Sequence, residues 1–501
     1  MVQARLDRAL AQRAWTQGLI CAALGGIAAL GQAPFDLWPL TLLAIGILFA
    51  LLRKSRSGKH ALGLGWAAGA GYFAVALMWL VEPFLVDVAR HGWLAPIALS
   101  AACFYFGFFW AATGWLTYLV RGQALGFISA FVLTEAARGY FFTGFPWAQV
   151  GHVWIDTPVL HWSSFAGSLG LTALVALGAV GVAFLIERDW VKGGGALGVP
   201  AVLFFAGMVA TPVLPPTDNA PLIRLVHPSE PQQERWDPDK IPGNFERKLD
   251  FTAGTDDVTP DLIVWPETSV PTLLSRAESW FDAMSDAAGG VPVVAGLQRF
   301  DGDDFFNSLI WLDAEGDVGA VYDKHHLVPF GEYVPFGDTL AKFGIFGLAD
   351  TTGGGYAPGP GPQVLDLGPL GRALPLICYE GVFPRDVGGY DTRPDFLLLI
   401  TNDAWFGEFS GPYQHLAQAR LRSAEQGLPT IRVANTGVTA MIDATGQITH
   451  RIGLSEAGWI DAPLPPARAK TIYARMGDMP IVAFFLVILM FCGLRARNAV
   501  S

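Results

Sequence analysis

Three polar residues with complementary chemistry lie in the second half of the chain. Glu267, Lys324 and Cys378 each follow a short, mostly apolar run of five residues, directly or after one proline. Runs of this kind, bounded by turn residues, are typical of buried strands. Because strand ends in an open α/β sheet converge on one crevice, we expect the three side chains to meet there. A carboxylate can then take the thiol proton, the thiolate can attack a carbonyl carbon, and the ammonium can stabilise the oxyanion.

Each of these residue types also has an ordinary structural role. A Glu or Lys behind a strand is most often a solvated loop residue, and a lone Cys is most often a small core residue. His325 and His326 could offer an imidazole base, but they follow Lys324 directly and are interpreted as structural. The sequence has no HExxH, no paired Cys/His spacing and no GxSxG elbow, so we predict no metal and no cofactor.

The composition indicates a membrane protein. Of 501 residues, 52% are hydrophobic and 15% are charged, against about 25% charged in a typical soluble domain. The formal charge of −11 argues against a nucleic-acid binder, which would show a basic face. Long apolar segments suit a bilayer core about 30 Å thick. We predict about eight transmembrane helices, near residues 17–33, 38–53, 63–82, 94–120, 124–142, 162–186, 196–213 and 480–494.

The distribution of apolar and polar residues along the sequence predicts three parts. These are a transmembrane bundle of about seven helices over 1–214, an external α/β domain over 215–474, and a last helix with its tail over 475–501. Arg and Lys follow the N-terminus and every second segment, which places them on one side if there are eight crossings. We take this side as cytoplasmic, with both termini inside and the large domain outside. The first apolar segment is interpreted as a retained helix rather than a cleaved signal.

The sequence motifs around the three residues resemble those of the nitrilase, or carbon–nitrogen hydrolase, superfamily with its Glu–Lys–Cys triad. The longer motifs, together with the apolar segments predicted to span the membrane, resemble one branch over the whole chain, the apolipoprotein N-acyltransferase family. The segments that carry this resemblance are Val264–Thr268, Tyr322–Pro335, Ile377–Glu380, Thr401–Gly407, Gly144–Trp147, Gln414–Arg420 and Asn435–Gly437.

The resemblance implies an αββα sandwich for the external domain and a role for each matched residue. Glu267 would be the general base, Lys324 the cation that stabilises the oxyanion, and Cys378 the nucleophile. Three further residues would support them: Glu332, Tyr379 and Glu380.

Residues that would contact the substrate are also implied. Trp236 matches a tryptophan on a loop over the site, although the preceding His227–Glu230 departs from the usual family turn. Asn402 and Trp405 lie in one of the family segments. Separately, the glycine-rich loop 336–356 carries Phe343 and Phe346, which could form an apolar lid or an ordinary packed patch.

The activity implied is a two-step acyl transfer at a bacterial inner membrane. Cys378 would take an acyl chain from a phospholipid, such as phosphatidylethanolamine, and pass it to the α-amine of an S-diacylglyceryl cysteine on an apolipoprotein. Both substrates are anchored in one leaflet of the bilayer. The transmembrane helices would hold the enzyme at that leaflet, so the substrates need not be extracted from the bilayer at a free-energy cost of about 0.8 kcal/mol per CH₂.

Three other functions remain open from the residues alone. A transporter would use the helices, but the segments show no evident internal repeat. A membrane-tethered amidase would use the same triad, and a lipoprotein-binding scaffold would use none of it. Glu135 and Arg138, three residues apart in one apolar segment, could form a functional charge pair or a salt bridge that holds the bundle together.

Overall fold

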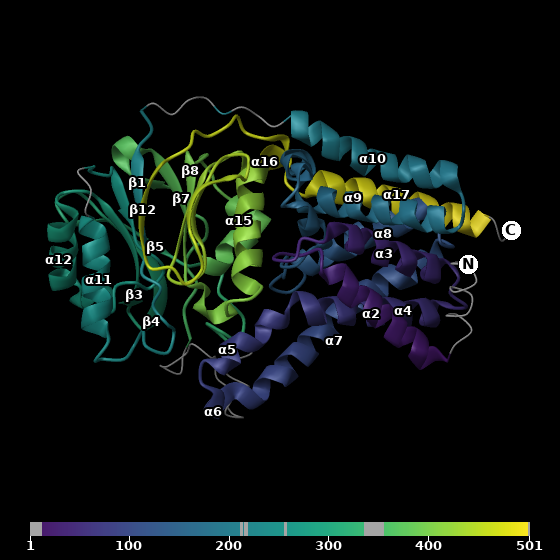
Figure 1. The fold of residues 1–501 in the computed structure, drawn as a ribbon, viewed down its shortest axis with the longest axis horizontal. Helices are drawn as coiled ribbons and strands as arrows, with labels where there is room; N and C mark the ends of the chain where they lie inside the picture. Colours follow the sequence, from purple (N-terminus) through teal and green to yellow (C-terminus); the bar gives the residue numbers. More distant parts are fainter. Residues whose placement is uncertain (1–12, 211–213, 215–218, 255–257, 335–354, 499–501) are drawn as a thin grey trace. The chain divides into compact units, whose positions relative to one another are not determined.

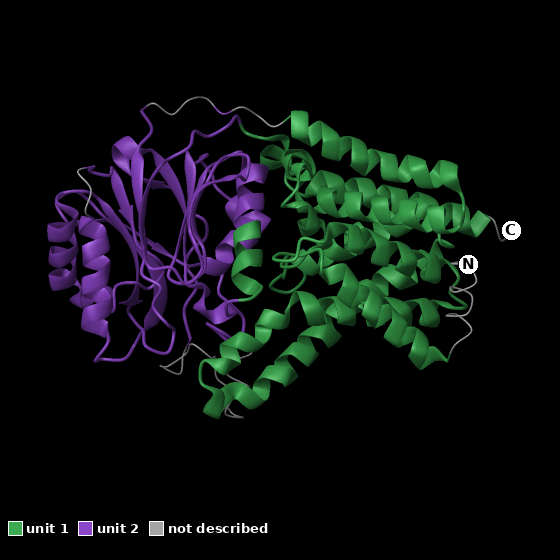
Figure 2. Ribbon diagram, in the orientation of Figure 1, with its two compact units in different colours: residues 1–212, 409–417, 470–501 green, residues 213–408, 418–469 purple. Residues whose placement is uncertain are grey.

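The computed structural model describes residues 13–210, 214, 219–254, 258–334 and 355–498. The chain divides into two compact units (Figure 2). Unit 1 comprises residues 1–212, 409–417 and 470–501, and unit 2 comprises residues 213–408 and 418–469. Phe343 and Phe346, the predicted lid residues, lie outside the described residues.

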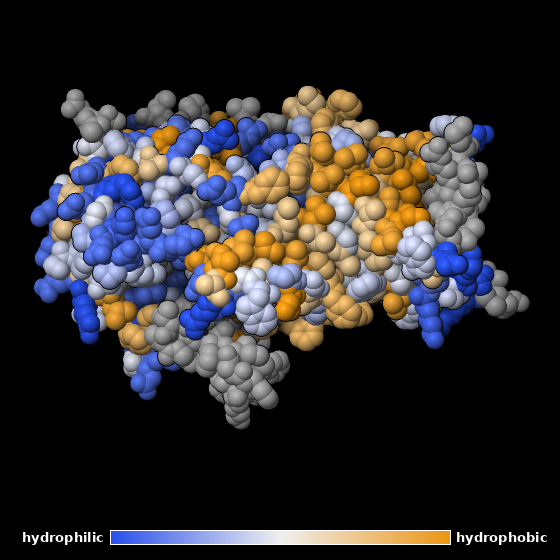
Figure 3. Space-filling view, turned by 60° about the horizontal axis from the view of Figure 1, so that its bottom comes forward, coloured by the Kyte–Doolittle hydropathy of each residue, from blue (hydrophilic) through white to orange (hydrophobic). Residues whose placement is uncertain are grey.

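Unit 1 is helical, and each of the eight apolar segments predicted from the sequence falls on a helix (Figure 1). On the face drawn in Figure 3, most of the right half of the molecule is hydrophobic, apart from a hydrophilic far end. The long helices are α2 (Ala14–Ala29), α3 (Trp38–Arg53), α4 (Gly58–Ala76), α7 (Ala95–Leu119), α8 (Ala124–Tyr140), α9 (Ser163–Ile186), α10 (Trp190–Val209) and α17 (Met479–Asn498), and the short ones are α5 (Glu82–Leu85), α6 (Val88–His91) and α16 (Ile472–Met476).

Fewer of these helices meet the length and hydropathy of a membrane span than the eight predicted. Among the described residues, four stretches qualify, and the bent pair Gly58–Ala76 with Met78–Leu85 makes a fifth if it counts as one span. Helices α2 and α3 are apolar but have only 16 residues each. The four stretches are Val88–Leu119, Pro158–Ile186, Trp190–Val209 and Met479–Asn498.

The segment predicted over 63–82 is not one straight helix. Helix α4 ends at Ala76 and the chain bends by 67°. After the bend, the backbone amide of Leu80 donates to the carbonyl of Leu77 at 2.9 Å, as in a 3₁₀ turn, and so does not bond to the carbonyl of Ala76. The carbonyl of Ala76 instead accepts a hydrogen bond of 3.1 Å from the side chain of Gln414. The bend therefore has a polar partner for the backbone group that it frees.

Glu135 and Arg138 form a fully buried ion pair on helix α8, with 2.7 Å between Arg138 Nη2 and Glu135 Oε2. The guanidinium also donates to the carbonyl oxygens of Phe145 and Trp147, at 2.5 and 2.7 Å. The carboxylate accepts from the indole of Trp110 at 3.3 Å. Every contact of the pair named here lies within unit 1, so we assign it to holding the loop after α8, rather than to a ligand.

We expect Arg138→Met to destabilise the protein by about 3–5 kcal/mol, because it leaves a buried carboxylate without its cation. Thermal unfolding in detergent micelles measures this loss. The double variant Glu135→Gln/Arg138→Met should recover part of it, since no charge is then left unpaired. Arg53→Met is the matched control: its pair with Glu187 is partly exposed and should contribute at most about 1 kcal/mol. Equal losses for Arg53 and Arg138 would contradict the assignment.

Unit 2 contains two six-stranded mixed sheets, with strand orders β12-β1-β2-β3-β4-β5 and β11-β10-β9-β8-β7-β6. The strands are β1 (Leu222–His227), β2 (Leu262–Val264), β3 (Val293–Asp301), β4 (Asp304–Leu312), β5 (Val318–Asp323), β6 (Leu365–Asp366), β7 (Arg372–Ile377), β8 (Phe396–Thr401), β9 (Thr430–Ala434), β10 (Thr439–Ile442), β11 (Ile448–Ile452) and β12 (Gly458–Pro463). The helices are α11 (Ile241–Ala253), α12 (Glu278–Ala288), α14 (Pro384–Val387) and α15 (Gly411–Gln426), of which residues 411–417 belong to unit 1.

The alternation of side chains along the strands explains the layers of unit 2. Leu262 and Val264 pack in one apolar cluster with residues of the second sheet, such as Ile400. Ile263, which points to the opposite face of β2, packs in another cluster with Phe281 of α12. The sheets therefore face each other, and helices α11 and α12 cover the outer face of the first sheet (Figure 1). On the second sheet, α15 is linked to β9 by a hydrogen bond of 2.6 Å between Ser423 and Thr430.

Candidate active site

Glu267 lies three residues beyond the end of β2, in the turn that leaves the first sheet. The residue is buried, at 7% exposure. Its Oε1 accepts a hydrogen bond of 2.8 Å from the side-chain amide of Asn307. Burial raises the pKa of the Glu267 carboxyl and the nearby carboxylate of Glu332 raises it further, while Lys324 and Asn307 oppose the shift. The carboxyl therefore holds a proton more readily than an exposed glutamate, which suits a general base.

Lys324 follows the last residue of β5 and is almost completely buried, at 1% exposure. Its Nζ is 2.7 Å from Glu332 Oε1 and 3.7 Å from Glu267 Oε1. Burial alone would lower the pKa of this ammonium, but the two carboxylates outweigh burial and hold the pKa above its ordinary value. Lys324 therefore remains a fixed positive charge between two carboxylates.

Cys378 follows the last residue of β7 and opens a short turn of helix over Cys378–Val382. Its backbone has φ of 53°, a left-handed conformation that a residue with a Cβ rarely adopts. Burial raises the pKa of the thiol and the charge of Glu267 adds to this, whereas Lys324 and a hydrogen bond from Thr401 oppose it. The resting side chain is therefore a neutral thiol that needs a base before it can attack.

The structure thus brings Glu267, Lys324 and Cys378 into mutual electrostatic contact in unit 2. Glu267 and Lys324 come from the first sheet, where β2 and β5 run in the same direction, and Cys378 comes from the facing sheet. A base, a cation and a thiol in one buried place can support attack on an acyl carbon and stabilise the oxyanion that forms.

Glu380 connects the cysteine loop to the lysine loop. Its carboxylate is fully buried and accepts hydrogen bonds of 2.7 Å from the backbone amides of Ile377 and His325. It also accepts a hydrogen bond of 3.0 Å from the hydroxyl of Tyr322. The residues before Cys378 and after Lys324 therefore share one anchor, which is a positioning role rather than a chemical one.

Glu332 and Tyr379 lie against the same loops. Glu332 accepts from the backbone amide of Val328 at 2.9 Å in addition to its contact with Lys324. The ring of Tyr379 is buried and meets the rings of His326 and Phe383 edge-on, with centroids 5.6 and 4.8 Å apart.

Asn307 is a polar site residue that no sequence pattern singled out. It lies within β4, and its amide donates to Glu267 Oε1 at 2.8 Å and to Glu332 Oε1 at 3.3 Å. The backbone carbonyl of Asn307 accepts from the backbone amide of Lys324 at 2.9 Å. One buried amide therefore orients both carboxylates. An asparagine inside the apolar run Phe305–Leu312 was the signal that could have revealed it.

The residues predicted to contact substrate differ in their surroundings. Trp236 is 47% exposed and Trp405 is half-buried. Asn402 is buried, at 3% exposure, and its amide bonds to Gln232 at 2.8 Å and to Asn435 at 3.0 Å. Of these three, Trp236 and Trp405 are the ones accessible to a substrate, and contact with substrate stays a prediction. In the part of the chain that the structure describes, no group of three His, Cys, Asp or Glu side chains could hold a metal ion.

His325 is placed as a structural residue among carboxylates. Its Nδ1 is 2.7 Å from Glu380 Oε1 and 2.8 Å from the hydroxyl of Tyr322, and its Nε2 is 3.8 Å from Asp386 Oδ1. Burial alone would lower the pKa of His325, but Asp386 and Glu380 raise it to about 9. The imidazolium therefore stabilises the loop behind Lys324.

The stability that His325 contributes should depend on pH. Because its pKa rises from 6.5 to about 9 on folding, the contribution is complete below pH 6.5 and is lost as pH rises through 9. The shift corresponds to on the order of 3 kcal/mol. Thermal unfolding of wild type and His325→Gln should differ most near pH 6 and converge above pH 9. His450→Gln is the control, since that ring bonds only to its neighbour Thr449 among the described contacts. A pH-independent gap between wild type and His325→Gln would contradict the expectation.

Comparison with known proteins places the two units in families. The model of the apolipoprotein N-acyltransferase N-terminal domain matches residues 24–181, and the carbon-nitrogen hydrolase model matches residues 232–473. A CN-hydrolase superfamily protein of Xanthomonas campestris, of known structure, aligns with 53% of this chain and 97% of its own at 21% identity and a TM-score of 0.37. A helical unit with several apolar helices joined to a carbon–nitrogen hydrolase domain defines the class: a membrane enzyme of the nitrilase superfamily.

Relatives over nearly the full length define the family within this class. The chain is 35% identical over 520 residues to the apolipoprotein N-acyltransferase of Rhodopseudomonas palustris, with 96% of both chains covered. It is 32% identical over 498 residues to that of Brucella melitensis, with 93% of both covered. The chain belongs to the apolipoprotein N-acyltransferase family.

Proposed function

We propose that this enzyme N-acylates the N-terminal S-diacylglyceryl cysteine of apolipoproteins, with a phospholipid as acyl donor and a thioester on Cys378 as intermediate. Glu267 is the general base, Lys324 stabilises the oxyanion, and Cys378 is the nucleophile. The observation that carries the proposal is the buried Lys324, which lies 3.7 Å from Glu267 and acts electrostatically on Cys378.

In the first half-reaction, Glu267 takes the proton of the Cys378 thiol, and the sulfur attacks the ester carbon of phosphatidylethanolamine. The negative charge moves to the ester oxygen, where the Lys324 ammonium stabilises it. The carbon–oxygen bond of the ester then breaks. The leaving glycerol oxygen takes the proton from Glu267, which releases a lysophospholipid and leaves the acyl chain on Cys378.

In the second half-reaction, the α-amine of the diacylglyceryl cysteine attacks the thioester carbon. Glu267 accepts a proton from the amine, the carbon–sulfur bond breaks, and the proton returns to the departing thiolate. The products are an amide and free Cys378, so the cycle is a ping-pong reaction. Thiolate leaves more readily than alkoxide when an amine attacks, which is the advantage of cysteine over serine here.

The proposed setting is the inner membrane of a bacterium. Residues 1–214 and 475–501 hold the enzyme in the bilayer with both termini in the cytoplasm, and residues 215–474 work on the periplasmic side. The hydrophobic surface of unit 1 supports the membrane part of this proposal (Figure 3). Water must be kept from the thioester, because hydrolysis would compete with transfer.

The test is the intact mass of the purified, detergent-solubilised protein after incubation with phosphatidylethanolamine. We expect the mass of one acyl chain to appear on the wild-type protein and to disappear when a diacylglyceryl-cysteine peptide is added, with acylated peptide as product. The same peptide with an acetylated α-amine is the control and should leave the adduct in place.

A membrane-bound amidase is the alternative that shares the triad. It would give an adduct that water discharges as fast with the peptide as without it. Absence of any adduct on a folded, monodisperse wild-type protein would overturn the thioester mechanism.

A further inference from the structure

The turn that carries Glu267 is held tightly from the side of strand β3. Thr268 has φ of 49°, so the chain turns through a left-handed conformation directly after Glu267. Gly296 of β3 approaches so closely that a Cβ there would lie 2.4 Å from the Thr268 nitrogen and 2.7 Å from the Glu267 Cα. The Gly296 amide also donates to the carbonyl of Pro266 at 3.2 Å. Such a strained turn persists only where its surroundings hold it.

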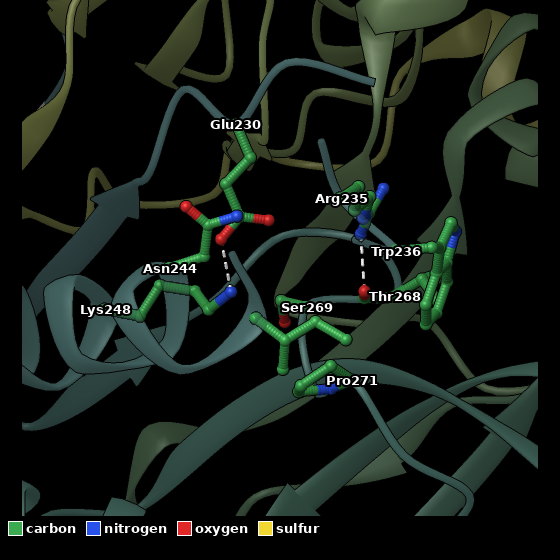
Figure 4. Close-up of a pocket in the computed structure, with 9 residues that line it drawn as sticks. Glu230, Arg235, Trp236, Asn244, Lys248, Thr268, Ser269 and Pro271 are labelled. Atoms are coloured by element: carbon green, nitrogen blue, oxygen red, sulfur yellow. Dashed lines mark hydrogen bonds and ion pairs between the residues drawn. The ribbon is translucent and has the colours of Figure 1, made fainter. Parts of the chain in front are cut away.

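Arg235 holds the same turn from the other side. Its guanidinium donates to the carbonyl oxygen of Glu267 and, at 2.5 Å, to that of Thr268. The contact with Thr268 is visible in Figure 4. Arg235 is buried, at 6% exposure. A buried cation with its donors on two successive carbonyl groups fixes both the position and the direction of the backbone between them.

The loop that carries Arg235 is itself anchored. Glu230 forms a buried ion pair with Lys248 of α11, and its backbone amide donates to the Asn435 side chain at 3.0 Å. Beyond Arg235 the chain reaches Trp236, which lines a small recess of about 10 Å³ together with Arg235 and Lys248 (Figure 4). The exposed indole of Trp236 and the guanidinium on the Glu267 turn are therefore consecutive residues of one anchored loop.

We propose that Arg235 is a positioning residue that holds the backbone of Glu267 in place and favours the ionised form of its carboxylate. This rests on the proposed role of Glu267 as general base. The contact has a mechanical part, through the two carbonyl groups, and an electrostatic part, because the buried cation lies near the carboxylate. Loss of the cation should make Glu267 easier to protonate, because the charge of Arg235 opposes the rise in the Glu267 pKa that burial causes.

The test compares Arg235→Met and Arg235→Lys in the full-length protein in detergent micelles. The rate of acyl-enzyme formation from phosphatidylethanolamine is followed by intact mass between pH 5 and 9. For Arg235→Met we expect a rate about 10- to 100-fold lower at pH 7, because the base is misplaced. We also expect the acid limb of its pH–rate profile to move to higher pH, because a nearby positive charge is lost. Arg235→Lys should lose rate but keep the acid limb of wild type, since the charge stays.

Arg247→Met is the matched control, because Arg247 bonds to Asn244 at 2.9 Å rather than to the Glu267 turn. It should retain the wild-type acid limb. A purely structural role for Arg235 would lower the unfolding temperature of Arg235→Met while the folded enzyme kept the wild-type acid limb. That result, or an equal shift in Arg247→Met, would overturn the proposal.

Glu267→Gln separates this proposal from the proposed function. If Glu267→Gln forms the acyl-enzyme at the wild-type rate, Glu267 is not the base, and the proposed mechanism fails whatever Arg235 does. If Glu267→Gln is slow while Arg235→Met matches wild type in rate and acid limb, the mechanism stands and the inference about Arg235 fails.

Discussion

Cys378→Ala is expected to abolish acyl transfer, with turnover at least about 10⁴-fold below wild type. The variant has no sulfur to form the thioester, and Glu267 and Lys324 then have no nucleophile to act on. Release of lysophospholipid and formation of acylated peptide should be lost together. Folding should be little affected, because a small buried thiol is replaced by a methyl group.

Cys378→Ser and Cys103→Ala complete this experiment. Serine keeps the shape of the site, but its hydroxyl is a weaker nucleophile and its ester is a poorer acyl donor to an amine, so we expect a slow enzyme or a trapped adduct. Cys103 lies on α7, among the apolar helices, and its replacement should leave turnover unchanged. An acyl adduct on Cys378→Ala that the peptide discharges would show that another residue is the nucleophile.

Lys324→Met is expected to lose both activity and stability. Removal of the ammonium takes away the charge that stabilises the oxyanion, which typically costs about 10²- to 10³-fold in rate. It also leaves Glu267 and Glu332 as two buried carboxylates without their cation, and breaking a buried pair in this way costs about 3–5 kcal/mol. Acyl-enzyme formation and thermal unfolding of the same preparation measure the two effects.

A second substitution separates the two roles of Lys324. Lys324→Met/Glu332→Gln removes one of the stranded carboxylates, so it should regain stability without regaining activity. Arg224→Met is the control for stability alone, because Arg224 is buried in a 2.7 Å pair with Asp461 between β1 and β12. It should unfold at lower temperature but form the acyl-enzyme at the wild-type rate while folded. Recovery of activity in the double variant would contradict the role of Lys324 in catalysis.

The strands of unit 2 that carry the site residues were accessible from the sequence because they are short and locally marked, whereas the layered fold of this unit followed from the family resemblance. The apolar runs before Glu267, Lys324 and Cys378 became β2, β5 and β7, and each polar residue lies at or just beyond the strand end. The structure of the helical unit 1 was less accessible from the sequence. Its apolar segments are helices, but the carbonyl of Ala76 at the bend bonds to Gln414, which lies far along the chain.

The supporting contacts of the site were not accessible from local patterns. Asn307 and Arg235 act on Glu267 from strand β4 and from the loop after β1, at separations of 40 and 32 residues. A polar residue in a strand and an arginine in a loop have many possible partners. The tertiary structure decides which partner each one has, because the paired strands bring Asn307 to Glu267 and Gly296 of β3 lies close against the Glu267 turn.

The sequence by itself determined the apolar helices and the residue types that could form a thioester, because hydrophobicity and spacing are local properties. The class of protein followed from the resemblance of its motifs to a known superfamily. The tertiary structure decided the charge state and support of those residues. Burial raises the pKa of Cys378 and of Glu267, and two carboxylates keep Lys324 charged against the effect of burial. These effects depend on depth and on distance between groups from separate strands, and neither quantity is written in the order of the residues.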